Sequence, residues 1–272
     1  MRHYIGSPPF QWQGEINRES EQLRGLVGWW TGQPASASII YNRSLATLAL
    51  NGTPYNGVTT AATEMGSALS LDGTNDYVSI AANALLNNAY VTLSCWFWTN
   101  NSINNKMMIM KAHSSHASPY YLLGMRHAGG NALYMDLTVN GAWQVAGGFS
   151  APNGQWNHAA ISYDGAKILC FTNGVLRSTV NISGTAATTN TPLLFGANNN
   201  LGKTSTYCWP GYLHDIRLYN RGLSAAEIWS LYDPQTRWEL YATPEYRRWF
   251  VPVVTGTIIP RVMHHLRQQG MS

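Results

Sequence analysis

The stretch WPGYLHDIRLYNRGLSAAEIWSLYD, residues Trp209–Asp233, contains in order a glycine turn, an alternating strand, a second turn and a short helix. Branched and aromatic side chains in Leu213–Tyr219 favour a strand, and Asn220–Gly222 ends it with residues that tolerate turn geometry. Ser224 and Glu227 have the Ser-x-x-Glu spacing of a capping box, in which each side chain bonds a backbone N–H at the start of the helix. This order predicts the closing segment of a β-sandwich.

Strand-like segments bounded by Gly, Asn and Asp recur upstream of this stretch. Period-two alternation in Ala68–Leu71 and Tyr77–Ile80 is what a strand with one buried face requires. Asp164-Gly165 and Asn173-Gly174 predict tight hairpins, so residues 156 to 181 should form a three-stranded antiparallel meander. The expected strand segments are GLVGWW, SALSLDG, DYVSI, VTLSCWFW, MMIMK, PYYLLGM, ALYMDLTV, WQVAGGF, WNHAAISYDG, KILCFTNG, VLRSTVN and PLLFGANNN.

The composition fits many short strands better than a helical bundle. Charged residues are few (11%), while Gly (25), Tyr (15) and Trp (11) are plentiful. At 272 residues the chain can bury a full core, and we expect one main domain. The formal charge of +4 is scattered along the chain, which argues against a nucleic-acid partner.

Cysteine usage and terminal composition indicate neither a disulfide framework nor a membrane partner. Cys95, Cys170 and Cys208 lack Cys-x-x-Cys spacing, and we expect buried thiols. Residues 1 to 22 hold no apolar core of the length that a secretory signal needs, so we expect no Sec-dependent export. The late apolar run Trp249–Met263 is short for a membrane span and is interrupted by two prolines.

Six segments, taken together and in this order, resemble the laminin-G-like members of the concanavalin A-like jelly-roll family. They are GLVGWW (Gly25–Trp30), GSALSLDGTNDYVSI (Gly66–Ile80), VTLSCWFW (Val91–Trp98), WNHAAISYDG (Trp156–Gly165), FTNGVL (Phe171–Leu176) and GYLHDIRLYNRGLSAAEIWSLY (Gly211–Tyr232). The resemblance implies two antiparallel sheets of roughly six or seven strands each, packed face to face, and the residue pattern indicates the same all-β class. We therefore expect an N-terminal arm (1–22), a laminin-G-like β-sandwich (23–233) with one short C-terminal helix, and a C-terminal tail (234–272).

Catalytic chemistry is not expected. A glycoside hydrolase on a related scaffold would need paired carboxylates on one strand, and the 13 acidic residues offer no such strand. The chain has no Gly-x-Ser-x-Gly, and none of its cysteines lies in an activating context. His113 and His116 have no acidic or thiol ligand nearby in the sequence, so we interpret them as polar loop residues. The sequence predicts a non-enzymatic protein.

Calcium is the ion that the resemblance implies, and it would be the one cofactor to consider. The sequence departs from the family pattern, since His214 stands where the family's closing strand has Asp, and Asn42-Arg43-Ser44 replaces an Asp-rich loop. The remaining calcium candidates are Asn42, Asp72, Asp76 and Asp215. For Asp72 and Asp76 the alternative is turn formation through hydrogen bonds to their own backbone.

Carbohydrate recognition needs aromatic platforms beside amide or carboxylate groups. The loop residues of these types are Tyr120, Tyr121, Trp143, Trp209, Asn198 and Asn199. The resemblance assigns Trp29, Trp96, Trp98 and Trp156 to core positions, so we interpret the abundance of aromatic residues mainly as packing.

After Asp233 the strand pattern gives way to mixed aromatic, basic and proline residues. Two interpretations stay open, namely a docking segment for another protein and a strap that lies along its own sandwich. The tail also resembles the ends of laminin-G-like proteins of tailed-phage virions. In the docking interpretation, Trp, Tyr and Arg would dominate the interface energetics. The anchors would then be Trp238, Tyr241, Tyr246, Arg247, Arg248 and Trp249.

The leading hypothesis from sequence is a virion structural protein, either a phage capsid decoration subunit or a head-fibre subunit, assembled in the host cytoplasm. Its partners would be other virion proteins, such as the major capsid or fibre protein, and sister subunits in a homo-oligomer. The alternative hypothesis is a carbohydrate-binding adhesion module for a glycan of the host cell surface.

Overall fold

The computed structural model describes residues 16–32, 38–44, 46, 48–100, 105–112, 121–128, 132–198 and 206–241. The strands within this part of the chain are β1 (Leu26–Trp30), β2 (Gly52–Tyr55), β3 (Thr59–Thr63), β4 (Gly66–Asp72), β5 (Tyr77–Ile80), β6 (Val91–Trp98), β7 (Lys106–Ala112), β8 (Tyr121–Ala128), β9 (Ala132–Val139), β10 (Ala142–Ser150), β11 (Asn157–Tyr163), β12 (Lys167–Thr172), β13 (Val175–Asn181), β14 (Leu193–Phe195) and β15 (Pro210–Tyr219). The helices are α1 (Ala225–Tyr232) and the 3-10 turns η1 (Glu21–Leu23), η2 (Leu48–Leu50) and η3 (Ala84–Leu86).

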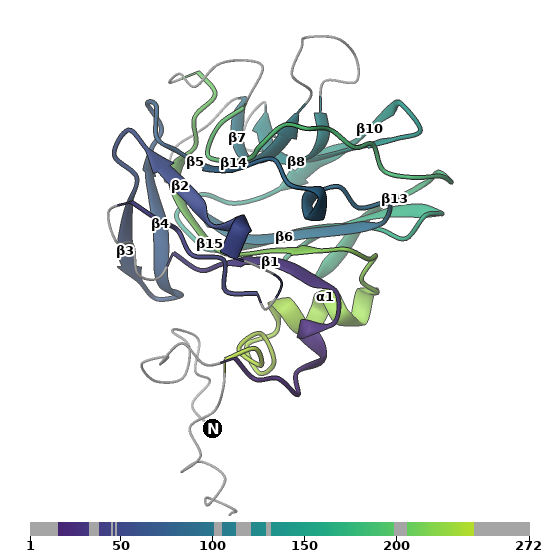
Figure 1. The fold of residues 1–272 in the computed structure, drawn as a ribbon, viewed down its shortest axis with the longest axis horizontal. Coiled ribbons are helices and arrows are strands. Elements are labelled where there is room, and N and C mark those ends of the chain that lie inside the picture. Colours follow the sequence, from purple (N-terminus) through teal and green to yellow (C-terminus); the bar gives the residue numbers. More distant parts are fainter. Residues whose placement is uncertain are drawn as a thin grey trace, which may run out of the picture.

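The strands form two antiparallel sheets packed face to face (Figure 1). The eight-stranded sheet has the order β13-β12-β11-β6-β15-β4-β3, with β1 also paired to β15. The seven-stranded sheet has the order β10-β9-β8-β7-β14-β5-β2. The predicted jelly-roll sandwich is confirmed. The meander predicted for residues 156 to 181 is formed by β11, β12 and β13, which pair in succession.

The core between the sheets takes every second residue of the central strands. In β6, Leu93, Cys95 and Phe97 point into this core, while Ser94 and Trp96 point to the opposite face of the sheet. Nearly the whole strand is buried on both sides, which is unusual for an antiparallel sheet and requires a cover on its outer face.

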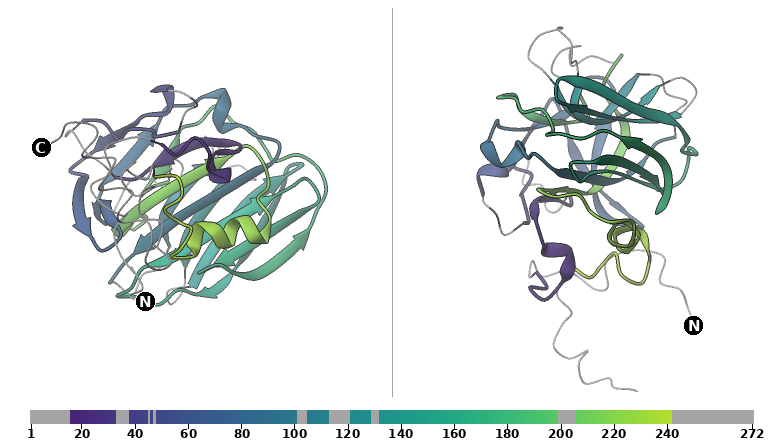
Figure 2. Two further views of the ribbon diagram at one scale, coloured as in Figure 1. Left: turned by 90° about the horizontal axis from the view of Figure 1, so that it is seen from below. Right: turned by 90° about the vertical axis from the view of Figure 1, so that its right-hand side faces the viewer.

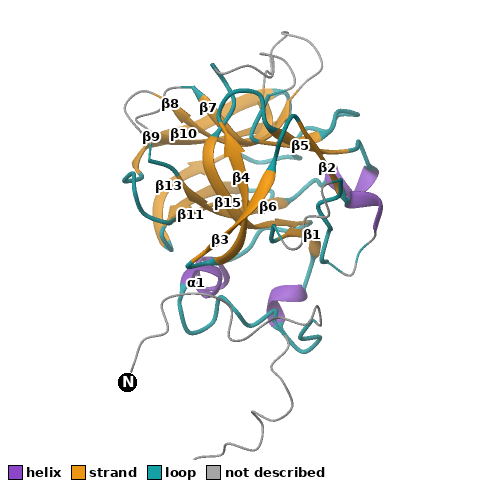
Figure 3. Ribbon diagram, turned by 90° about the vertical axis from the view of Figure 1, so that its left-hand side faces the viewer, coloured by secondary structure: helices purple, strands orange, loops and turns teal. Residues whose placement is uncertain are grey.

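That cover is a second apolar layer beneath the eight-stranded sheet, visible below the sandwich in Figure 2 (right) and Figure 3. It consists of α1 and the segments 16–23 and 234–241, which join through a single β-bridge between Ile16 and Tyr241. Its buried residues are Leu26, Trp29, Ala160, Phe171, Tyr219, Leu223, Ile228, Leu231, Leu240 and Tyr241. The described parts of the predicted arm and tail therefore belong to the folded body.

The three cysteines are buried and free, as predicted. Within the described ranges, none of the helices combines the length and the apolar character that crossing a bilayer requires.

The predicted capping box is present at α1. The Ser224 hydroxyl accepts from Glu227 N at 3.3 Å, and Glu227 Oε2 accepts from Ser224 N at 2.8 Å. Arg221 Nη2 lies 2.6 Å from Glu227 Oε1 and holds that carboxylate in place. These contacts fix the helix that closes the second layer.

Removing the cap should measurably destabilise the protein. Ser224→Ala leaves a backbone N–H of the first helical turn without its side-chain partner, and we expect a loss of about 1 kcal/mol in the free energy of unfolding. Urea unfolding measures this loss. Ser150→Ala, at an exposed position of β10, is the matched control and should change stability by less than about 0.5 kcal/mol. Equal values for the two variants would contradict the prediction.

Candidate functional site

Aromatic rings lie in a row on the outer face of the eight-stranded sheet. Trp98 and Tyr212 have ring centroids 5.2 Å apart, and those of Tyr212 and Trp156 are 6.2 Å apart. The row continues through His214, whose centroid lies 6.3 Å from that of Trp156 and 6.2 Å from that of Trp238. The row arises because β6 and β15 turn alternate residues to this face, away from the inter-sheet core.

A groove of about 330 Å³, which we call the outer groove, opens beside this row. Trp96 is buried in it and stacks on Tyr232, with centroids 5.6 Å apart and planes inclined by 15°. Trp156 is half-buried in its lining, and the Gln155 side chain is exposed. The lining residues are Glu64, Met65, Trp96, Gln155, Trp156, Asn173, Tyr232, Pro234 and Arg237. They come from the β3–β4 turn, β6, the approach to β11, the β12–β13 turn and the end of α1 with the residues after it.

The Arg237 side chain is held between two indoles in the outer groove. Its Cζ lies 5.2 Å from the ring centroid of Trp96 and 4.9 Å from that of Trp238, and the residue is only 3% exposed. Nε and Nη2 have no hydrogen-bond partner among the described residues. Burial lowers the pKa of Arg237, yet an arginine stays protonated near neutral pH. The groove therefore contains a buried positive charge.

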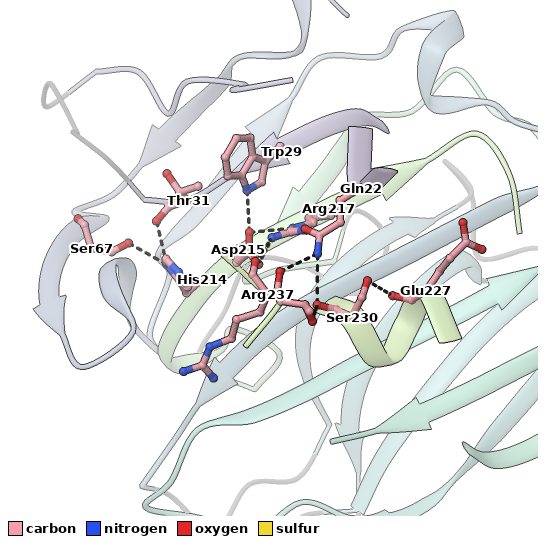
Figure 4. Close-up of polar contacts among 11 residues, drawn as sticks. Gln22, Trp29, Thr31, Ser67, His214, Asp215, Arg217, Glu227, Ser230 and Arg237 are labelled. Atoms are coloured by element: carbon pink, nitrogen blue, oxygen red, sulfur yellow. Dashed lines mark hydrogen bonds and ion pairs between the residues drawn. The ribbon is translucent and has the colours of Figure 1, made fainter. Parts of the chain in front are cut away.

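A buried ion pair lies close to the groove (Figure 4). Asp215 has a φ of 50°, and the register of β15 against β6 shifts between His214 and Arg217, so a bulge accommodates the acid. Arg217 Nη2 lies 2.8 Å from Asp215 Oδ2, and Arg217 Nε donates to Asp215 Oδ1 at 2.9 Å. Trp29 Nε1 donates to the same Oδ1 at 2.6 Å. Burial alone would raise the pKa of Asp215, but the charge of Arg217 and the hydrogen bonds from Arg217 and Trp29 hold it below its ordinary value.

Arg217 also binds both flanking segments. Its Nη1 donates to Gln22 Oε1 at 2.7 Å, and its Nη2 donates to the main-chain oxygen of Arg237 at 3.1 Å. Gln22 Nε2 in turn donates to the main-chain oxygens of Ser230 and Thr236 at 3.2 and 3.0 Å. We call Gln22, Asp215 and Arg217 the polar clip, because they tie residues 16–23 and 234–241 to the sheet.

The residues predicted as calcium ligands lie in two separate places. Asn42 and Asp215 both contact Trp29, whose main-chain N donates to Asn42 Oδ1 at 2.9 Å. Asp72 pairs with Pro210 at the other end of β15, which is roughly 16 Å of strand away from Asp215. The described residues contain no group of three or more His, Cys, Asp or Glu side chains placed to hold a metal ion.

Asp72 and Asp76 make the turn bonds that were the alternative to calcium. Asp72 Oδ1 accepts from Thr74 N at 2.7 Å and from Asn75 N at 3.3 Å. Asp76 Oδ2 accepts from Asp72 N at 3.1 Å. These backbone bonds lower the pKa of Asp72, although its partial burial alone would raise it.

Trp143 lies on the opposite side of the molecule from the outer groove, on β10 of the seven-stranded sheet. It is 37% exposed, and its Nε1 donates to Asp136 Oδ1 at 3.1 Å. Asp136 also pairs with Arg126, whose Nε lies 2.8 Å from Asp136 Oδ2. Trp143 is therefore an accessible aromatic platform, as predicted for a glycan-binding residue, but it lies far from the groove.

The other glycan-binding candidates do not join Trp143. Trp209 is fully buried in the inter-sheet core against Phe97, with centroids 5.9 Å apart, and Asn198 is also fully buried. Their prediction as accessible loop residues is wrong, because the chain between β14 and β15 runs through the interior at these positions. Tyr120, Asn199 and the side chain of Tyr121 lie outside the described residues.

Two of the six predicted anchors support the protein's own fold. Tyr241 is buried, with its ring centroid 5.2 Å from that of Trp29, and Trp238 packs against Tyr241 at 5.4 Å. Both rings pack within the protein's own second layer, Tyr241 buried and Trp238 half-buried, so this part of the tail is the strap of the second interpretation. The other anchors, Tyr246, Arg247, Arg248 and Trp249, lie outside the described residues.

Sequence reasoning does not identify the outer groove. It assigns Trp96 and Trp156 to the core, whereas both lie on the outer face of the sheet. It also treats Arg237 only as part of the C-terminal tail, with no role in a site. The available signal is the alternation in β6, which sets Trp96 and Trp98 opposite Cys95 and Phe97. Nothing in the sequence places Arg237 between two indoles, because that contact depends on how the tail folds back.

Comparisons with known proteins agree with the observed architecture. A family model described as the concanavalin A-like lectin/glucanases superfamily matches residues 72–229. Comparison with curated protein sequences gave no match.

Several solved structures share the fold at low sequence identity. Domain 4 of AbnA, an extracellular arabinanase from Geobacillus stearothermophilus in complex with arabinotriose, is 16% identical with a TM-score of 0.58, over 76% of this chain and 98% of that one. The binding domain of Paraclostridial Mosquitocidal Protein 1 is 15% identical with a TM-score of 0.59, over 79% of this chain. The binding domain of botulinum neurotoxin DC, in complex with rat synaptotagmin II, is 14% identical with a TM-score of 0.57, over 76% of this chain. The chain spans about half the length of these two toxin domains, 53% and 51% respectively.

Proposed function

The chain belongs to the concanavalin A-like lectin/glucanase superfamily, and on that premise we propose that it is a carbohydrate-binding module whose ligand lies in the outer groove. The observation that carries the proposal is the combination of Trp96, Trp156 and Tyr232 with polar groups in one cavity of about 330 Å³. Sites for small ligands combine aromatic walls with a few polar groups that fix orientation. The arabinotriose complex of AbnA domain 4 shows that a protein of this fold accommodates a saccharide.

The proposed activity is binding without catalysis and without calcium. Glu64 is the only carboxylate among the described residues that line the groove, and glycoside hydrolysis normally uses two. Asp215, the calcium candidate whose charge acts through space on Arg237 of the groove, is already paired with Arg217. Binding should therefore survive EDTA, and no saccharide should be cleaved.

Trp156→Ala tests the site. The variant removes a half-exposed ring at the groove without touching the inter-sheet core, and we expect saccharide affinity to fall by about tenfold or more. A glycan array on the full chain, followed by calorimetry on the best ligand, measures the change. Trp143→Ala is the matched control, because it removes an exposed indole from the other sheet and should leave binding unchanged.

The opposite result, in which binding is lost with Trp143 and kept without Trp156, would place the ligand on the seven-stranded sheet and contradict the proposed site. Binding of no saccharide by the correctly folded chain would contradict the proposed function itself.

The virion hypothesis depends on the anchors beyond residue 241. Trp238 and Tyr241 stabilise the second layer of the protein itself. Under the virion hypothesis, the contacts to other virion proteins would therefore be made by Tyr246, Arg247, Arg248 and Trp249. A virion subunit and a carbohydrate-binding module are compatible in one protein. We place saccharide binding first because its residues lie together in one described groove.

A further inference from the structure

Arg237 is a buried cation with two donor atoms, Nε and Nη2, that are not used within the described protein. It is 3% exposed, and its Nε and Nη2 atoms have no partner among the described residues. Buried charged groups in proteins are ordinarily paired, because water no longer stabilises them. A buried cation without a partner needs an explanation. The outer groove beside Arg237 has room for a ligand that would pair with it.

The nearby carboxylates do not provide that partner. Asp215, Asp233 and Glu64 each act on Arg237 through space in the direction that favours its charge. However, Asp215 is bonded to Arg217 and Trp29, and Asp233 Oδ1 accepts from Gln235 N. Figure 4 shows the Arg237 guanidinium pointing away from the polar clip, with no contact drawn to it. Only its main-chain oxygen belongs to that network.

The side chain is also held in one orientation. The indoles of Trp96 and Trp238 lie 5.2 and 4.9 Å from Cζ, and such contacts favour a cation over an aromatic face. Their π faces attract the charge but satisfy none of its N–H donors in the plane of the guanidinium. The result is a fixed pair of donors, Nε and Nη2, of the kind that binds the two oxygens of a carboxylate.

We infer that the outer groove selects a saccharide that carries a carboxylate, such as a uronic or sialic acid residue, and that Arg237 binds this acid group. The inference rests on the proposed function and specifies its ligand class. The sugar ring would lie along Trp156, and its carboxylate would accept from Nε and Nη2 once the side chains that cover these two buried atoms have moved aside. A single negative charge fits better than a doubly charged phosphate, because Glu64 lines the same cavity and would repel the second charge.

Calorimetry on the full chain tests the inference with two matched pairs of probes. Trigalacturonic acid is compared with galactotriose, and 3′-sialyllactose is compared with lactose, in the same buffer and salt. At least one acidic probe should bind about tenfold or more tightly than its neutral counterpart, which is the scale of a hydrogen bond to a charged group. The pair that shows the difference identifies the source of the acid group.

Arg237→Gln should bring the affinity for the acidic probe down to that of the neutral one. Arg237→Met serves as a second variant, because an unbranched apolar side chain fits between the indoles and removes the buried charge. It should lose the acidic preference while its thermal unfolding midpoint stays equal or rises, a combination that a merely structural arginine would not give. Arg177→Gln, at an exposed position on β13, is the matched control and should keep the acidic preference.

Four results would overturn the inference. If acidic and neutral probes bind equally and both depend on Trp156, the groove binds neutral sugars and only the choice of ligand class fails. If the acidic preference persists in Arg237→Gln, the acid group is held elsewhere. If inorganic phosphate displaces the acidic saccharide at equal concentration, Arg237 forms an unspecific anion site. If no saccharide binds, the proposed function fails and this inference fails with it.

Discussion

Substitution of Asp215 by Asn should lower the free energy of unfolding by about 3 to 5 kcal/mol, which makes it the most destabilising exchange that we expect outside the core. Asn retains the shape of the side chain, and it tolerates the left-handed backbone that Asp215 adopts with a φ of 50°. The exchange therefore removes the negative charge with little backbone strain. Arg217, which is fully buried, would be left in the interior without its carboxylate.

The loss should also appear in the segments that Arg217 binds. Without the Asp215 carboxylate, the Arg217 guanidinium is no longer held in place, and its hydrogen bonds to Gln22 and to the main-chain oxygen of Arg237 are weakened. Residues 16–23 and 234–241 should therefore exchange amide hydrogens faster. Chemical denaturation measures the stability, and hydrogen exchange measures the local effect. The double variant Asp215→Asn, Arg217→Met should recover part of the loss, because it no longer buries an unpaired charge. A loss below about 1 kcal/mol in Asp215→Asn would show that the ion pair is not what holds the second layer.

The closing segment could be predicted from sequence because its signals are local. The strand ends at a turn of permissive residues, and Ser224 and Glu227 form the capping box with the spacing expected. The Asn173-Gly174 hairpin was predictable for the same reason, since both residues adopt positive φ angles of 51° and 74°. In each case a few neighbouring residues determine the backbone.

Two strands were not predictable in this way. β2 contains Pro54 and lies at the edge of the seven-stranded sheet, and β3 is a small polar segment at the edge of the eight-stranded sheet. Edge strands tolerate proline and bury little, so they lack the branched, alternating pattern that marks the central strands. Their pairing depends on the neighbouring strands β5 and β4.

The site could not be predicted because it depends on contacts between distant segments. Asp215 looks like a metal ligand in the sequence, but its bulge and its partner Arg217 make it part of an ion pair. Trp96 lies on a strand buried on both faces, so its sequence context does not distinguish the inner face from the outer one. The groove exists only once α1 and residues 234–241 have folded back over the sheet.

Acid should destabilise the protein well above the pH at which its carboxylates are protonated, because two histidines are buried in uncharged form. Burial lowers the pKa of His158 from 6.5 to about 3, and it also lowers that of His214. His214 Nδ1 lies 3.0 Å from Thr31 O and 2.9 Å from Ser67 O, so this nitrogen carries the proton of a neutral ring. Both rings are at most 1% exposed.

Below pH 6.5 the unfolded chain binds protons at these histidines while the folded chain does not, so stability falls as the pH falls. For His158 alone, lowering the pH from 7.5 to 5 should cost about 2 kcal/mol, and His214 should add to this loss in the same direction. The contribution of Asp215 to stability changes over a different, more acidic pH range. Its folded pKa is depressed, so its stabilising effect is complete above the ordinary value of 3.8 and is lost only at lower pH.

His158→Phe separates this effect from general acid sensitivity. Phenylalanine fits against Trp96 and Tyr232, whose ring centroids lie 5.2 and 6.2 Å from that of His158, and it does not titrate. Urea unfolding at pH 7.5 and at pH 5 should therefore show a loss that is smaller by about 2 kcal/mol than in the unmodified protein. Tyr232→Phe perturbs the same packing without removing a titrating group in this range, and it should keep the full pH dependence. If His158→Phe keeps the full loss as well, His158 is protonated in the folded protein, and the acid sensitivity must come from His214 or from groups on the surface.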